Sequence, residues 1–119
     1  MGLGYATAEF FAEQGAYLTL VDYNEEKLKE AAKTLSDKYP NAKILTVMAD
    51  VSKEEQVKNY VEKAHKEYSR IDGLYNNAGI EGETALLTEY DVDAFKKVID
   101  INLMGVYYGM RYVLPIMIK

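Results

Sequence analysis

The 119-residue sequence contains no cysteine and a single histidine, His65. The absence of cysteine excludes disulfide bonds, thiolate catalysis and cysteine zinc sites. One histidine cannot by itself build a histidine-rich metal cage. We therefore expect no metal site, and we interpret His65 as a partly exposed structural residue rather than a catalytic one.

Basic residues are outnumbered by acidic ones, 14 against 19, which gives a formal net charge of −5. This balance disfavours broad electrostatic attraction to nucleic acid or to anionic membranes. No apolar run approaches the ~20 residues needed to span a bilayer. The chain also does not open with the basic and apolar segments of a secretory signal. We expect a cytoplasmic protein that binds neither nucleic acid nor membrane.

The composition is that of one globular domain, with 49% hydrophobic and 28% charged residues. The hydrophobic pattern predicts helices over residues 4–14, 24–39, 52–68 and 91–117. It predicts short strands over residues 17–21, 44–48 and 71–75. Strands that are apolar along most of their length are buried on both faces. The alternation of such strands with helices therefore predicts an α/β fold with a parallel sheet and helices on both faces.

Three helix boundaries are marked by residue type. Gly15 is suited to the position that ends the first helix. Asn24 is a good N-cap for the second helix, followed by two glutamates in its first turn. Ser52 and Glu55 have the spacing of a capping box and are expected to start the third helix.

Polar residues follow each of the three predicted strands, namely Asp22, Asp50 and the run 76–79. In an open parallel sheet, ligands bind outside the carboxyl ends of the strands. Gly2 and Gly4 open the first helix, where small residues let a phosphate approach the free backbone N–H groups. A G-x-G pair alone is a weak signal, equally consistent with an ordinary glycine-rich helix start.

Asp22 lies 18 residues after Gly4, close to the spacing expected for the acid that binds an adenosine ribose. It is followed by Tyr23 and Asn24 rather than by an arginine, which favours NAD over NADP. The alternative is a turn aspartate that merely ends the strand. Asp50 could accept a hydrogen bond from the adenine amino group, with Val51 against the ring. A simple turn carboxylate is an equally good interpretation of Asp50 alone.

Four segments together resemble the short-chain dehydrogenase/reductase family. These are Gly2-Leu3-Gly4-Tyr5-Ala6-Thr7-Ala8 with the later Asp22, Ala49-Asp50-Val51-Ser52, Asn76-Asn77-Ala78-Gly79, and Asp100-Ile101-Asn102-Leu103-Met104-Gly105. The resemblance covers essentially the whole chain, in order and at family spacing. It implies a Rossmann-like doubly wound parallel sheet and NAD(P)-dependent hydride transfer on an alcohol or carbonyl substrate.

The resemblance also implies roles for individual residues. Cofactor contacts are implied for Gly2, Leu3, Gly4, Asp22, Tyr23, Asp50, Val51, Asn77, Ala78, Gly79 and Ile101. Asn102 is implied as a catalytic-site residue that holds a water in the proton relay, from a break in its helix. Without the motif, Asn102 is better interpreted as a hydrogen-bonded polar side chain on a partly buried helix, because asparagine is a mediocre helix former. The equivalent helix in the family helps to build an oligomer, so we expect a homo-oligomer.

The sequence departs from the family at both ends. The first strand, the early part of the glycine-rich loop, the catalytic serine and the Tyr-x-x-x-Lys pair have no counterpart in it. Tyr23 and Lys27 have the pair's spacing but follow the second strand of the family fold, so we interpret them as coincidence. We therefore expect residues 1–119 to form a partial NAD-binding Rossmann domain, incomplete at its first and C-terminal strands and inactive alone.

The missing first strand would lie in the centre of the family sheet. We expect the sheet to close up, the gap to be filled by another chain, or the fold to be marginally stable. Two other functions stay open from the sequence. One is an S-adenosylmethionine methyltransferase-like domain, which also uses a glycine-rich turn and acids after its second and third strands. The other is a non-enzymatic truncated product.

Overall fold

The computed structural model describes residues 2–119, and Met1 lies outside the described part. The regular elements are five α-helices, two strands, one 3₁₀ turn and one π-helix. In chain order they are α1 (Leu3–Glu13), β1 (Leu18–Asp22), α2 (Glu25–Lys38), β2 (Ile44–Met48), α3 (Glu54–Tyr68), η1 (Leu87–Glu89), α4 (Val92–Ile99), η2 (Asp100–Met104) and α5 (Gly105–Ile118).

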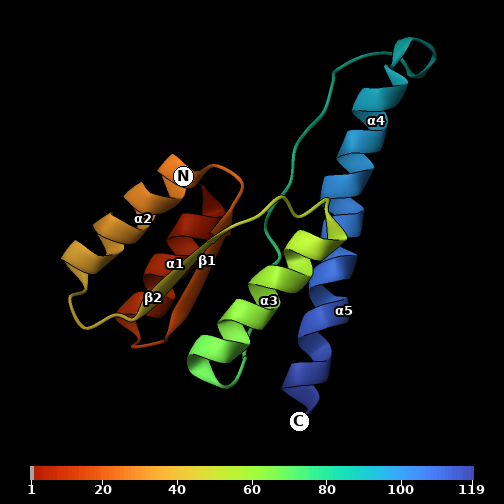
Figure 1. Cartoon of the computed structure of the whole chain (residues 1–119). Helices are drawn as coiled ribbons and strands as arrows, with labels where there is room; N and C mark the ends of the chain where they lie inside the picture. The colour runs from red at the N-terminus through yellow and green to blue at the C-terminus, as the bar shows by residue number, and fades with distance from the viewer. Residues whose placement is uncertain (1) are drawn as a thin grey trace.

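The two strands form a parallel pair in which Leu18 lies opposite Ile44 and Asp22 lies opposite Met48. Helix α2 makes the crossover between them and packs on both, burying Leu28 and Leu35. Figure 1 shows α2 and α3 on opposite sides of the two strands. This βαβ unit confirms the predicted α/β class with helices on both faces.

Two of the three predicted helix boundaries are confirmed. Gly15 has φ +85°, and the N–H groups of Gly15 and Ala16 donate to the carbonyls of Ala12 and Phe11. This is a Schellman ending, which suits glycine because it has no Cβ to oppose a positive φ. The Asn24 side chain accepts a hydrogen bond from the Lys27 N–H at 3.0 Å and so caps α2.

The predicted capping box at Ser52 and Glu55 is wrong. Lys53 is the N-cap of α3 and makes no side-chain capping bond. The Ser52 hydroxyl instead donates to Asp50 Oδ1 at 2.6 Å. The hydrogen bond to the carboxylate is charge-assisted, and it turns the Ser52 hydroxyl toward Asp50 instead of toward the N–H groups at the start of α3.

The predicted third strand over residues 71–75 does not form, and in residues 2–119 the sheet has only two strands. Ile71 and Leu74 still pack against the hydrophobic core, so the segment is placed by its side chains. A strand also needs a neighbour for its backbone N–H and C=O groups. The segment does not pair with β1, and the expectation that the sheet closes up is therefore wrong.

The hydrophobic core lies between the strands, α3 and α5. Its buried members are Val47, Ala49, Val57, Tyr60, Val61 and Val113. Helices α3 and α5 are also joined by a hydrogen bond from the Tyr112 hydroxyl to Glu54 Oε2. The long helical pattern after residue 91 is confirmed, but it is divided into α4, the π-helix η2 and α5. Within residues 2–119 no helix is both long enough and apolar enough to cross a membrane.

Candidate functional site

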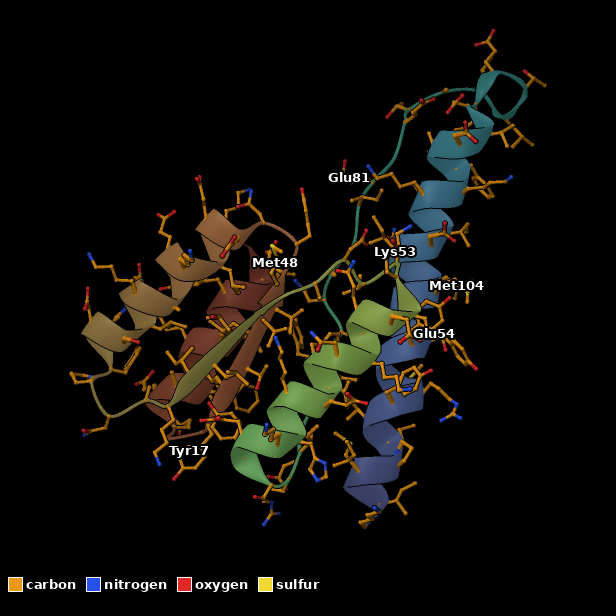
Figure 2. All side chains as sticks on the ribbon, viewed as in Figure 1. Tyr17, Met48, Lys53, Glu54, Glu81 and Met104 are labelled. Carbon is orange, nitrogen blue, oxygen red and sulfur yellow. The ribbon has the colours of Figure 1, made fainter. Side chains whose placement is uncertain are left out.

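The carboxyl ends of β1 and β2 and the start of α1 lie at one edge of the fold. Helix α1 has 11 residues and β1 has five, so each spans about 16 Å. They are joined by the tight turn at Gly15, which brings the start of α1 back to the end of β1. Figure 2 shows this edge at Met48 and the opposite edge at Tyr17. We call the Met48 edge the carboxyl edge.

The start of α1 has the properties of an anion site. Its N-cap is Gly2, no side chain caps it and its first turn holds no acid, so its first N–H groups and dipole are uncompensated. A Cβ at Gly4 would lie 2.8 Å from Asn77 Nδ2. The glycine therefore allows the Asn77 side chain against the helix, and the structure brings these two predicted site residues together.

Asp22 ends β1 at the same edge. Its Oδ1 accepts the N–H of Asn24 at 2.8 Å, and this bond fixes the carboxylate beside the start of α2. Next to it the Tyr23 side chain is 76% exposed, and Leu3 at the start of α1 is 73% exposed. Asp22, Tyr23 and Leu3 thus present a carboxylate and two apolar surfaces to solvent at one edge.

Asp50 occupies the turn that links β2 to α3. Asp50 Oδ1 accepts hydrogen bonds from both the N–H and the hydroxyl of Ser52. These bonds, chiefly the one from the hydroxyl, hold the pKa of the Asp50 carboxyl below its usual value, and Lys53 and Lys97 add to the effect. Val51 packs on Gly105, where a Cβ would lie 2.9 Å from Val51 Cγ2. The turn is therefore anchored on α5.

Asn76 was not among the predicted site residues, yet it anchors the 76–79 run. Its Nδ2 donates to the Val106 carbonyl at 3.2 Å, and its Oδ1 lies 2.8 Å from where a Cβ of Gly109 would be. Gly105 and Gly109 are both buried and lie four residues apart, so they share one face of α5. Val51 packs against the first glycine and Asn76 against the second. That four-residue spacing was the one sequence signal for this contact.

Asn102 lies in the π-helix, which confirms the predicted irregularity in this helix. Its Oδ1 accepts the Ile80 N–H at 2.8 Å, and its Nδ2 donates to the Ile80 carbonyl at 2.7 Å. A Cβ at Gly79 would lie 3.2 Å from Asn102 Oδ1, so Gly79 allows this close approach. The side chain therefore pairs with the backbone of the 76–80 segment. A role in catalysis stays a prediction, as do the cofactor contacts of all the predicted residues, Ala78 and Ile101 included.

We expect Asn102→Ala to release the segment that follows Gly79. The substitution removes both hydrogen bonds with Ile80, which together are worth about 1–3 kcal/mol. Amide hydrogen exchange should show loss of protection at Ile80 and a lower free energy of unfolding. Asn41→Ala, at an exposed position before β2, is the matched control and should change neither. Unchanged exchange at Ile80 in Asn102→Ala would show that the two Asn102 hydrogen bonds do not hold this segment in place.

Two tyrosine–lysine pairs have the Tyr-x-x-x-Lys spacing. Tyr23 and Lys27 lie at the carboxyl edge, while Tyr39 and Lys43 lie between α2 and β2 at the opposite edge. Lys43 Nζ stands 4.8 Å from the centre of the Tyr17 ring. The second pair is not among the predicted site residues, and its position at the opposite edge separates it from the candidate site.

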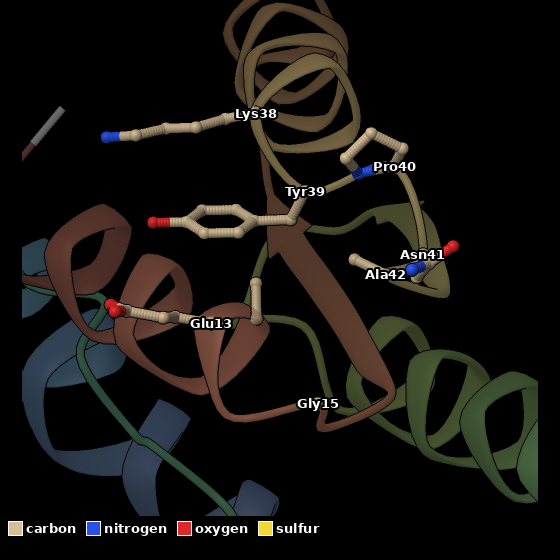
Figure 3. Close-up of a pocket in the computed structure, with 8 residues that line it drawn as sticks. Glu13, Gly15, Lys38, Tyr39, Pro40, Asn41 and Ala42 are labelled. Atoms are coloured by element: carbon tan, nitrogen blue, oxygen red, sulfur yellow. The ribbon is translucent and has the colours of Figure 1, made fainter.

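A pocket in the described chain is also remote from the carboxyl edge. It lies between the end of α1 and the α2–β2 connection, and Figure 3 shows the Tyr39 ring between the Lys38 and Glu13 side chains. A second, more apolar hollow is formed by Leu87, Tyr90, Val92 and Phe95. The described residues contain no cluster of potential metal ligands. Neither hollow includes a predicted site residue.

The chain is similar to known oxidoreductases. Levodione reductase from Leifsonia aquatica is 45% identical over 98% of this chain and 43% of its own length. A crystal structure of levodione reductase superposes with a TM-score of 0.94, covering 98% of this chain and 45% of that one, at 45% identity. This chain thus spans less than half of either relative.

Two cofactor-bound structures have the same fold. NAD⁺-bound xylitol dehydrogenase is 34% identical with a TM-score of 0.91, covering 97% of this chain and 44% of its own. L-Sorbose reductase from Gluconobacter frateurii, complexed with NADPH and L-sorbose, is 31% identical with a TM-score of 0.87, covering 98% and 43%. The family model for short chain dehydrogenase matches residues 1–119. The chain therefore belongs to the short-chain dehydrogenase family and has its Rossmann-like fold.

Proposed function

We propose that this chain is the cofactor-binding portion of an NAD(H)-dependent oxidoreductase that acts on an alcohol or carbonyl substrate. The observation that carries the proposal is the gathering of an uncapped helix start and two carboxylates, Asp22 and Asp50, at the carboxyl edge. The helix start offers N–H groups to a diphosphate, and Asp22 offers its free oxygen to ribose hydroxyls. Asp50 accepts a hydrogen bond from the amino group of the adenine base.

The residues present fit an adenine dinucleotide. The start of α1 is uncapped and lacks an acid that would repel the diphosphate, and Gly4 adds no side chain of its own where the Asn77 amide lies against the helix. When bound, the nicotinamide ring supplies the hydride. This chain's residues bind and orient the cofactor, while Asn102 fixes the backbone at Ile80. Within residues 2–119, the two tyrosines with a lysine four positions later, Tyr23 and Tyr39, lie after β1 and between α2 and β2. Neither is assigned the protonation of a forming alkoxide, so we propose that the chain alone does not turn over.

The choice of NAD rests on Asp22. The relatives include both an NAD⁺ complex and an NADPH complex. A carboxylate at the ribose repels a 2′-phosphate, and the exposed Tyr23 that follows it offers no positive charge. The relatives named for xylitol, levodione and L-sorbose support an alcohol or ketone as the substrate class.

Calorimetry on the purified chain tests this function. We expect NADH to bind and S-adenosylmethionine not to bind, since the two ligands share only the adenosine part. We expect no steady-state oxidation of NADH with ketone substrates. Binding of S-adenosylmethionine in place of NADH would support the methyltransferase alternative. Binding of neither ligand would contradict the cofactor site.

A homo-oligomer is supported by one further feature. The last three helical segments expose a row of apolar side chains at helical spacing. They are Phe95, Leu103, Tyr107, Met110, Leu114 and Ile118. Burial of such a row against a second copy would remove apolar surface from water. We propose that this row is the self-association surface.

A further inference from the structure

Within the turn between β2 and α3, hydrogen bonds hold the side chain, the N–H and the carbonyl of Asp50. Asp50 Oδ1 accepts the Ser52 N–H at 3.0 Å and the Ser52 hydroxyl at 2.6 Å. The Asp50 N–H donates to Gln56 Oε1 at 2.7 Å, and the Asp50 carbonyl accepts the Lys53 N–H at 3.0 Å. Within residues 2–119, the only Asp50 polar atom left without such a partner is Oδ2.

These bonds fix both the direction and the charge of the carboxylate. Two donors on Oδ1 hold one side-chain rotamer, and Gln56 holds the backbone that carries it. The Ser52 hydrogen bonds also lower the pKa of the Asp50 carboxyl, which favours its ionised form. An ionised carboxylate accepts hydrogen bonds and cannot donate them. Oδ2 therefore offers a single, fixed acceptor.

A fixed acceptor distinguishes purine bases by the group on carbon 6. Adenine carries an amino donor there, whereas a 6-oxopurine such as hypoxanthine carries a carbonyl, which repels a carboxylate oxygen. Val51 sits beside Asp50 and is anchored on Gly105 of α5, so the turn does not shift to relieve a mismatch. Because the turn is rigid, adenine and a 6-oxopurine should differ in their free energy of binding.

We propose that Ser52 is a positioning residue that gives this site its preference for adenine over 6-oxopurines, by holding Asp50 Oδ2 toward the base. The inference rests on the proposed dinucleotide site. It goes beyond that site by assigning base selection to the hydroxyl of Ser52, with Gln56 as support for the Asp50 backbone.

The test compares NAD⁺ with nicotinamide hypoxanthine dinucleotide, which differs in the base alone. Calorimetry on the 119-residue chain should give a dissociation constant about 10-fold lower for NAD⁺, corresponding to about 1.4 kcal/mol. In Ser52→Ala this ratio should fall to about threefold or less, because the carboxylate can rotate away from the base. Ser52→Thr keeps a hydroxyl and should restore the ratio. Ser36→Ala, an exposed serine on α2, is the control and should leave it unchanged.

Each outcome decides between this inference and the proposed function. Equal affinity of the unsubstituted chain for the two dinucleotides would overturn the base selection and leave the dinucleotide site standing. Equal weakening of both ligands in Ser52→Ala, with the ratio preserved, would show a purely structural serine and also overturn it. Binding of neither dinucleotide by the unsubstituted chain would overturn the proposed function, and the inference with it.

Discussion

Replacement of Leu35 by alanine is expected to unfold a large part of the protein at room temperature. Leu35 is 0% exposed and lies on the face of α2 that packs against the two strands. Removal of a buried leucine side chain costs about 2–5 kcal/mol, because transfer energy is lost and a cavity remains. A domain of this size is stable by only about 5–15 kcal/mol. Because the edge of β1 away from β2 has no strand partner within residues 2–119, we expect a value toward the lower end of that range.

Urea unfolding followed by circular dichroism measures this effect. The unfolding midpoint should fall steeply in Leu35→Ala, and part of the helical signal should be lost before denaturant is added. Leu87→Ala makes the same chemical change at a side chain that is 89% exposed. Its free energy of unfolding should therefore change by less than about 0.5 kcal/mol, and its midpoint should hardly move. A Leu35→Ala midpoint as high as that of Leu87→Ala would show that α2 does not form part of the cooperative core.

The helices and the two paired strands could be predicted from the sequence because their signals are local. Asn24 caps the helix that it precedes, and Gly15 ends the helix that it follows. The strand over 44–48 was predicted at the bounds observed. The segment 71–75 has an equally apolar sequence, but its state depends on a neighbouring strand. A pattern within one segment carries no information on whether such a partner is present.

In the candidate site, too, local features could be predicted from the sequence and long-range contacts could not. Asp22 and Asp50 could be predicted because the carboxyl ends of parallel strands meet at one edge. The contacts that hold them in place could not. Asn76 reaches a carbonyl 30 residues away, and Asn102 reaches the backbone of a residue 22 positions earlier. At Ser52 the sequence allowed two local partners for the hydroxyl, the N–H donors of a helix start and the carboxylate acceptor of Asp50, and only the folded geometry decides between them.

Asp22→Ala is expected to have the largest effect on cofactor binding. The carboxylate accepts hydrogen bonds from two ribose hydroxyls in the proposed complex, and each bond to a charged group is worth about 1.5–3 kcal/mol. Their loss predicts a dissociation constant for NADH about 10²–10⁴ times higher, measured by calorimetry. Asp37→Ala removes an exposed carboxylate from α2 and is the matched control. Its affinity for NADH should equal that of the unsubstituted chain.

Asp22→Asn separates the charge of this side chain from its shape. The amide oxygen can still accept the Asn24 N–H, so the entry into α2 is preserved while the negative charge is lost. NADH affinity should fall, and the affinity for NADPH should rise relative to NADH because repulsion of the 2′-phosphate disappears. An unchanged NADH-to-NADPH ratio in this variant would place the adenosine ribose away from Asp22. Since Asp22 supplies the one charged acceptor at the end of β1, that result would also remove the basis for choosing NAD.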